Sequence, residues 1–446
     1  MTIRRAFTAP IRWAKDDLLR RLVRNAGVLL SGSMAASALQ LISLAVTARA
    51  LGPEQFGLLA LITAYVLIVD GLFNFQSWQA FIKYGTDALS HDRIGDFRCL
   101  VKIGFVLDGT TALIGGSAAA IAVYLVAPWF GWSRDLQIMT MLYSLIICFH
   151  VAGTVTGVLR VYGSFKILAG HQFLSAISRT IGVMIAFFAG WDLPGFLLIW
   201  AVSDIFSQVL LVGLGLRELQ RRDVKGVLRE PLRSVGKKFP AFWLFIWTTN
   251  LNGSIRSASR ELDTLVIGYM LGPAAAGLFK IAKQYSLALA KFSDPLYQAI
   301  FPDLSRLYST GQVAAFRSLI RRSACLAGAG ALLIWLVFFF GGGHILTLTA
   351  GPDYIDAYGV LIIHMLGTSI SVFAFPLQPA MLSMGRPMTT FYVHIVSATL
   401  HIFALWACLS AVGLSGAGVA YVFYYLCWTG LMLYHTSRFL KLGESE

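Results

Sequence analysis

The chain has 446 residues, of which 57% are hydrophobic and only 13% are charged, and its mean hydropathy is +0.70. Soluble domains carry about 25% charged residues, so this composition excludes an ordinary soluble protein. Apolar stretches of roughly 20 residues recur along the chain, each long enough to cross about 30 Å of hydrocarbon. They lack the alternation of a transmembrane β-barrel. The sequence therefore predicts an all-α polytopic membrane protein.

The net charge of +14 comes from Lys and Arg in the segments between the apolar stretches. In a membrane protein this pattern indicates topology, so we expect no nucleic-acid partner. The five cysteines show no metal-binding spacing and are interpreted as small core residues. They are Cys99, Cys148, Cys325, Cys408 and Cys427.

Residues 1–24 are rich in arginine and contain no cleavable signal peptide. Basic and apolar residues alternate there, which fits a partly amphipathic cytoplasmic segment lying on the membrane. A disordered positive tail is the alternative interpretation.

Twelve transmembrane helices are predicted, six in each half of the chain. The first six are 27–50, 56–78, 102–127, 136–158, 169–190 and 194–216. The second six are 242–270, 278–301, 323–348, 355–381, 388–412 and 415–436. The expected domains are an N-lobe (25–216), a basic cytoplasmic linker (217–239), a C-lobe (240–437) and a cytoplasmic tail (438–446).

Lys and Arg concentrate in every second connection, beginning with the N-terminus and including the linker 217–239. The positive-inside rule therefore predicts that both termini are cytoplasmic. An even number of spans in each half predicts a parallel repeat, related by a pseudo-twofold along the membrane normal.

A repeated motif supports this duplication. Residues 51–58 read L-G-P-E-Q-F-G-L and residues 271–278 read L-G-P-A-A-A-G-L, 220 positions later. Each copy is predicted to form the polar outer turn between the first two spans of its half. Internal duplication is typical of transporters that work by alternating access.

Charge inside the predicted membrane is concentrated in spans seven and eight. Span seven carries Arg256, Arg260, Glu261 and Asp263, and span eight carries Lys280, Lys283, Lys291 and Asp294. Charged groups in hydrocarbon are costly unless paired or hydrated, so these helices should line a water-filled cavity. Five cations against three acids favour an anionic substrate site with phosphate or carboxylate groups. The alternative is structural pairing of Asp263 with Lys283, and of Asp294 with Arg256 or Lys291.

The first half carries fewer charges. Asp70 lies near the middle of span two, Arg49 closes span one, and Asp108 lies where it can reach interfacial water. Arg179 and Asp204 lie at similar depth in spans five and six, which favours a structural ion pair. Four histidines also fall within spans, as hydrogen-bonded core residues or as proton carriers: His150, His364, His394 and His401.

The sequence lacks the phosphate-binding loop G-x-x-x-x-G-K-[ST], so ATP is not expected as the direct energy source. It also lacks the HExxH zinc motif and the G-x-S-x-G nucleophile motif. We expect no enzyme activity, no metal site and no cofactor.

The segment 260–273, RELDTLVIGYMLGP, continues through Gly277 to Ala282, and residues 49–65 are its first-half counterpart. With this motif the whole chain resembles the multidrug/oligosaccharidyl-lipid/polysaccharide (MOP) exporter superfamily. It is most similar to the polysaccharide transporter branch, the Wzx-type flippases of lipid-linked oligosaccharides.

This resemblance implies two pseudo-symmetric six-helix lobes around a central cavity lined by spans one, two, seven and eight. It implies flipping of a polyprenyl-pyrophosphate-linked O-antigen, capsule or exopolysaccharide unit to the periplasmic leaflet of the bacterial inner membrane. Other polysaccharide assembly proteins are the further partners that we expect besides the lipid bilayer. The expected substrate-binding residues are Arg256, Arg260, Lys283, Lys291, Arg49 and Lys280.

Coupling to Na⁺ or H⁺ is usual in the superfamily. The candidates for cation coupling or ion pairing are Asp70, Asp263, Asp294 and Glu261. Two alternatives share the fold. A multidrug/cation antiporter would favour an acid-rich cavity, and a lipid II flippase typically has two further C-terminal spans, whereas this chain stops soon after span twelve. A membrane scaffold or polymerase would not need the repeated lobes.

Overall fold

The computed structural model of the protein describes residues 17–75, 77–224, 226–227, 239, 241–291 and 293–442. Within these ranges the structure describes only the backbone of residues 17–31, 33, 252, 255–259, 294–295, 298–299 and 441–442. Residues 1–16 of the predicted N-terminal segment, 228–238 of the linker and 443–446 of the tail therefore lie outside the described residues.

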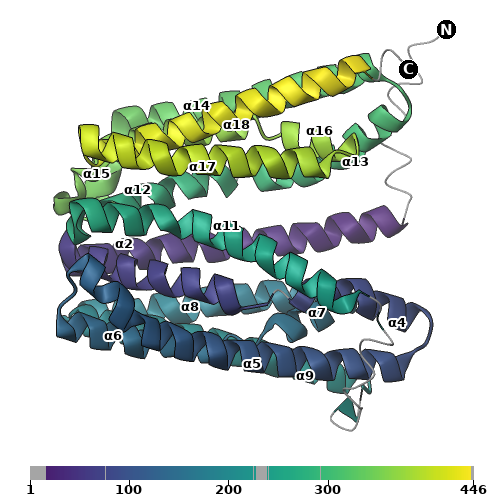
Figure 1. Cartoon of the computed structure of the whole chain (residues 1–446), viewed down its shortest axis with the longest axis horizontal. Helices are drawn as coiled ribbons and strands as arrows, with labels where there is room; N and C mark the ends of the chain where they lie inside the picture. The colour runs from purple at the N-terminus through teal and green to yellow at the C-terminus, as the bar shows by residue number, and fades with distance from the viewer. Residues whose placement is uncertain are drawn as a thin grey trace. The chain divides into compact units, whose positions relative to one another are not determined.

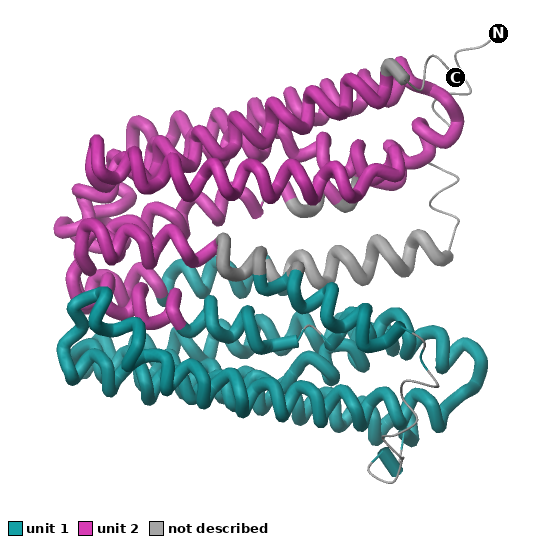
Figure 2. The backbone as a smooth tube through the Cα atoms, viewed as in Figure 1, with its two compact units in different colours: residues 1–43, 66–258 teal, residues 44–65, 259–446 magenta. Residues whose placement is uncertain are grey.

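The described part of the chain is helical and contains no strand, which confirms the predicted all-α fold class. It forms two compact units (Figure 2). Unit 1 consists of Met1–Ser43 and Val66–Ala258, and unit 2 of Leu44–Tyr65 and Ser259–Glu446. Residues 44–65 thus pack with the second half of the chain. The lobe limits given above stay a prediction.

The helices of unit 1 begin with α2 (Asp17–Phe73), whose segment 44–65 belongs to unit 2. The others are α3 (Ser77–Ala80), η1 (Phe81–Gly85), α4 (Thr86–Ser90), α5 (Ile94–Val126), η2 (Ala127–Phe130), α6 (Arg134–Ser144), η3 (Leu145–Phe149), α7 (Gly153–Val161), α8 (Phe165–Phe188) and α9 (Leu193–Arg221). Figure 1 shows α8 and α9, which pack along each other.

Unit 2 contains the second part of α11 (Phe242–Leu271), whose first part belongs to unit 1. The others are α12 (Pro273–Lys291), α13 (Ser293–Ser309), α14 (Val313–Thr349), η6 (Pro352–Tyr354), α15 (Ala357–Phe373), α16 (Leu377–Ser383), α17 (Pro387–Val412) and α18 (Ser415–Leu442). The pair α17 and α18 repeats the packing of α8 and α9.

Eight helical stretches among the described residues are long and apolar enough to cross a membrane. The first, Met34–Ser90, contains most of the first predicted span (27–50) and all of the second (56–78). Helices α8, α11 and α12 are not among the eight, and the last two carry the charged side chains of spans seven and eight. A polytopic membrane fold is therefore confirmed, and the count of twelve spans stays a prediction.

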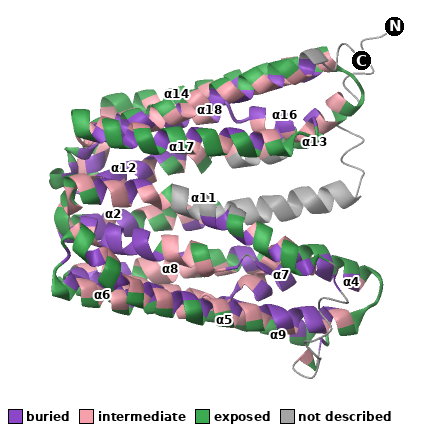
Figure 3. Ribbon diagram, viewed as in Figure 1, coloured by how far each residue is buried: buried purple, intermediate pink, exposed green. Residues whose placement is uncertain are grey.

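Many large apolar side chains are exposed on the helices of both units, and Figure 3 marks the exposed positions in green. Leu125 on α5 is 72% exposed and Phe340 on α14 is 80% exposed. Contiguous apolar surface of this kind is unfavourable in water and favourable in lipid. The exposed faces of these helices are therefore the ones that hydrocarbon solvates.

The duplication is visible in the backbone. Positive φ angles occur at Gly52 and Gly272, Gly131 and Gly351, Gly163 and Gly385, and Gly190 and Gly413, pairs that are 220 to 223 positions apart. Gly52 (φ 68°) sits at a kink in α2 and Gly272 (φ 89°) lies between α11 and α12. Glycine adopts this left-handed conformation without strain, and the following proline has no N–H to continue the helix. The turn predicted at each motif is confirmed.

The two motif copies also contact each other within unit 2. A Cβ on Gly57 would overlap the backbone carbonyl of Pro273, and one on Gly277 would overlap the carbonyl of Pro53. Only glycine permits such close backbone approach between membrane helices. The motif therefore serves helix packing as well as the turn.

Predicted spans four and ten are interrupted at corresponding places. The first breaks between η3 and α7, at residues 150–152, and the second between α15 and α16, at residues 374–376. Interrupted helices in equivalent positions of two halves are a frequent mark of ligand or ion sites in transporters.

Candidate functional site

Several charged residues of α11 and α12 contact one another in unit 2. The Lys280 ammonium lies 3.0 Å from Glu261 Oε2 in an ion pair. Lys283 is buried, with 6% of its surface exposed, and its ammonium donates to the backbone carbonyl of Arg260. Two of the five predicted cations are therefore held by partners on α11.

Asp263 of α11 is buried and pairs with His401 of α17, with 3.1 Å between Asp263 Oδ1 and His401 Nε2. The other ring nitrogen of His401 lies 3.1 Å from the carbonyl oxygen of Ala420. The structural alternative paired Asp263 with Lys283, whereas the direct partner of the carboxylate is the His401 imidazole. Lys283 remains close enough for an electrostatic interaction with Asp263.

The remaining predicted substrate residues are placed as follows. Arg260 and Lys291 are exposed. Arg49 donates from Nη1 to the carbonyl of Leu348, 3.0 Å away in the last turn of α14. The side chains of Arg256 and Asp294 lie outside the described residues. Among the described side chains no acid pairs with Arg260, so its guanidinium is available to an anion.

A second cluster lies in unit 1. His150, at the break after η3, has Nδ1 3.0 Å from Asp70 Oδ1 and Nε2 2.7 Å from Asp204 Oδ2. The other oxygen of Asp204 lies 3.6 Å from Arg179 Nη2. We call these four residues the His150 cluster. The cluster joins α2, α8 and α9 to the chain break of span four.

The sequence did not reveal the partners of either histidine. It placed His150 and His401 within spans but gave neither a partner. The available signal was a histidine inside an apolar stretch, with the nearest acids on other spans. Which acid it meets depends on helix packing, which periodicity does not reveal.

A polar pocket of about 380 Å³ opens beside the His150 cluster. Asp204 and Arg179 form part of its wall, so the cluster is in reach of water. Its other polar lining comes from α2, α8 and α9, namely Ser37, Gln40, His171, Gln172, Ser175 and Ser207.

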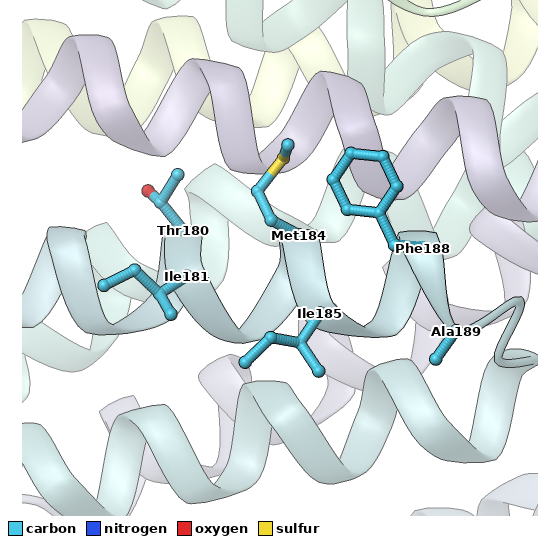
Figure 4. A pocket seen from close by; sticks show the side chains of 6 residues that line it. All are labelled: Thr180, Ile181, Met184, Ile185, Phe188 and Ala189. Atoms are coloured by element: carbon cyan, nitrogen blue, oxygen red, sulfur yellow. The ribbon is translucent and has the colours of Figure 1, made fainter.

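A separate pocket of about 540 Å³ lies along the C-terminal part of α8 (Figure 4). Its lining is almost wholly apolar, and Ile181, Ile185 and Phe188 are each more than half exposed. This is the character of a helix surface that lipid solvates, so we assign no polar substrate to it.

Asp108 differs from its prediction. It is 2% exposed, so it does not reach interfacial water. Its Oδ2 accepts the backbone N–H of Thr154 at 2.6 Å, in the first turn of α7. Gly153 has no side chain that would crowd this carboxyl. Asp108 therefore satisfies an N–H that the interruption of span four leaves without a helical partner.

Asp108→Ala should lower the free energy of unfolding by about 1–2 kcal/mol, because the first turn of α7 loses its capping acceptor. Asp108→Asn retains an acceptor oxygen and should lose less. Thermal unfolding of the two purified variants in detergent checks this order. Equal stability of wild type and Asp108→Ala would contradict the capping role.

Comparison with known proteins agrees with this architecture. Residues 22–308 match the family described as polysaccharide biosynthesis protein. The chain is 29% identical over 353 residues to inner membrane protein YghQ of Escherichia coli, covering 78% of this chain and 98% of that protein. It is 23% identical over 194 residues to "Probable flippase AglR" of Haloferax volcanii, covering 43% and 40%.

Two solved structures share the fold. An inward-facing multidrug resistance MATE family transporter of the MOP superfamily aligns with a TM-score of 0.73 at 11% identity, over 92% of this chain and 96% of its own. Lipid II flippase MurJ in an inward closed conformation aligns with a TM-score of 0.72 at 14% identity, over 92% and 87%. These two alignments show the shared fold, and the family match over residues 22–308, together with this fold, confirms the predicted resemblance.

Proposed function

The chain belongs to the polysaccharide biosynthesis protein family, and from that premise we propose that it is a flippase for a polyprenyl-pyrophosphate-linked oligosaccharide. The relatives named inner membrane protein and flippase support this proposal. We further propose that the protein crosses the bacterial inner membrane with both termini in the cytoplasm. Its task is transport, and we assign it no catalytic step.

The observation that carries the proposal is the charged face of α11 and α12. Lys280 and Glu261 neutralise each other, and Asp263 is engaged with His401. The Arg260 side chain is exposed. The backbone carbonyl of Arg260 accepts a hydrogen bond from the buried ammonium of Lys283. A guanidinium binds phosphate oxygens through two parallel hydrogen bonds. A pyrophosphate group is an anion of matching charge and geometry.

In this proposal the lipid-linked pyrophosphate binds at Arg260 and Lys291. Alternating access then exposes this site to one side of the membrane at a time. The acids around the cations lower the net charge of the site, so that the anion is attracted yet can still leave. A cavity of acids alone would suit a cationic drug instead.

Arg260→Ala should reduce surface glycan export by roughly tenfold to a hundredfold, the equivalent of one charge-assisted hydrogen bond of about 1.5–3 kcal/mol. The measurement is surface glycan in a host whose own flippase gene is deleted and replaced by this one. Membrane levels of the protein should not change, because the Arg260 side chain is exposed.

The matched control is Arg321→Ala, which removes an exposed cation from α14. It should leave export unchanged. Wild-type export by Arg260→Ala would remove this residue from the substrate site. Resistance to cationic drugs without glycan export by the wild-type chain would favour the antiporter alternative.

A further inference from the structure

The His150 cluster contains a hydrogen-bond arrangement that fixes its proton count. Both ring nitrogens of His150 face carboxylate oxygens, Nδ1 toward Asp70 and Nε2 toward Asp204. A neutral imidazole has one N–H donor and one lone pair, and ionised carboxylates only accept. One of the two short contacts therefore requires an additional proton, either on the imidazole or on a carboxyl group.

Charge balance leads to the same count. With an imidazolium, two positive groups (His150 and Arg179) face two carboxylates (Asp70 and Asp204). Loss of the proton leaves a net charge of −1 and turns one N···O contact into repulsion between lone pairs. In a membrane interior such an imbalance is unfavourable, so the contact should open.

The other titratable groups near the cluster are Tyr143, His171 and Asp108, whereas the described contacts of His150 are with Asp70 and Asp204. Tyr143 of α6 lies near Arg179 and Asp204, and His171 of α8 lines the adjoining pocket. Asp108 of α5 is engaged by the N–H of Thr154, four residues after His150. Asn74 donates to the same Asp70 oxygen at 3.3 Å but is uncharged.

The polar pocket supplies the route for the proton. Asp204 lines it, and the Asp204 and Arg179 side chains are 24% and 26% exposed, against 10% for His150. A proton leaving His150 Nε2 can pass to Asp204 and then to water in the pocket. No other reactant is needed.

We propose that the His150 cluster is a proton-binding site, loaded from the polar pocket, whose proton holds α2, α9 and the break in span four together. Release of the proton breaks one of the two carboxylate contacts of His150, which frees α2 or α9 from it. The coupling of this step to substrate movement rests on the flippase function proposed above and names H⁺ as the coupling ion. Proton binding itself does not depend on that function.

The test is ¹⁵N nuclear magnetic resonance of the full-length protein in lipid nanodiscs, labelled only at histidine. The signal missing in His150→Gln assigns His150. The wild type should show both His150 nitrogens protonated at neutral pH and should lose this signal reversibly as the pH rises. Asp70→Asn and Asp204→Asn should each give a neutral imidazole, because the new amide N–H can donate to the lone pair of the facing His150 nitrogen. Asp135→Asn, an exposed carboxylate on α6, should leave the signal unchanged.

Two results would overturn the proton site. The first result combines two observations: His150 is neutral in the wild type, and neither Asp70→Asn nor Asp204→Asn removes a carboxylic-acid infrared band. The other is an imidazolium that persists up to the pH at which the protein unfolds. If one of the two Asp→Asn variants does not fold, the other still tests the infrared band, and the second result needs only the His150 assignment and the wild-type spectrum.

Coupling has its own assay. Asp70→Asn should lower glycan export at least tenfold in the complementation host, whereas Asp135→Asn should not. Wild-type export by Asp70→Asn would overturn coupling and leave the flippase function intact. A wild-type chain that shows the proton signature yet exports no glycan would overturn the proposed function and leave the proton site intact.

Discussion

Gly57→Ala will destabilise the protein by about 1–3 kcal/mol or more, the range for adding a methyl group to a site with no room. The new Cβ would overlap the carbonyl of Pro273, and a backbone carbonyl cannot rotate away as a side chain can. Gly277→Ala should have the same effect for the reciprocal reason, since its Cβ would overlap the carbonyl of Pro53. Thermal unfolding in detergent, followed by tryptophan fluorescence, measures both variants.

Gly109→Ala is the matched control. Gly109 lies in α5, and a Cβ there would meet nothing within 4 Å. Alanine is favoured over glycine in a helix by roughly 1 kcal/mol, so this variant should be as stable as the wild type or more stable. If Gly57→Ala behaves like Gly109→Ala, the two motif copies do not pack as closely as the structure shows.

Asp263→Ala has the second large expected effect. The Asp263 carboxylate is buried, pairs with His401 and interacts electrostatically with Lys283. Removing it leaves buried positive charge without its counter-charge, which costs about 3–5 kcal/mol in comparable buried pairs. We expect poor accumulation of folded protein in the membrane and a lowered midpoint of thermal unfolding.

The double variant Asp263→Ala/His401→Leu separates charge imbalance from lost packing. It removes both members of the pair, so its stability should exceed that of Asp263→Ala alone. Asp353→Ala, an exposed carboxylate of η6, should stay within about 0.5 kcal/mol of the wild type. Additive losses in the double variant would show that Asp263 and His401 act independently.

The sequence predicts where charge is concentrated along the chain, and whether those residues bind substrate stays a prediction. Its structural alternative paired Asp263 with Lys283. In the structure the direct partner of the Asp263 carboxylate is His401, 138 positions away, and Lys283 interacts with it electrostatically. Sequence spacing ranks neighbours on one helix, whereas burial selects partners from any helix that packs there.

The helix interruptions also separate what the sequence predicts from what only packing reveals. Apolar length predicted spans 136–158 and 355–381, because hydropathy measures only whether a segment is soluble in lipid. It does not reveal that the backbone leaves the helix at residues 150–152. Asp108 makes this break tolerable by accepting a freed N–H, and His150 uses it to reach two carboxylates.

The sequence by itself determined the membrane class, the duplication and the turn at each L-G-P motif, because apolar length, repeated letters and the special backbone of Gly-Pro are local properties. Only the tertiary structure decided which charges meet. It brought Gly57 against Pro273, Asp263 against His401, and His150 between Asp70 and Asp204. These contacts join residues far apart in the chain, and in a low-dielectric interior each buried charge is stabilised only by the partner that packing places beside it.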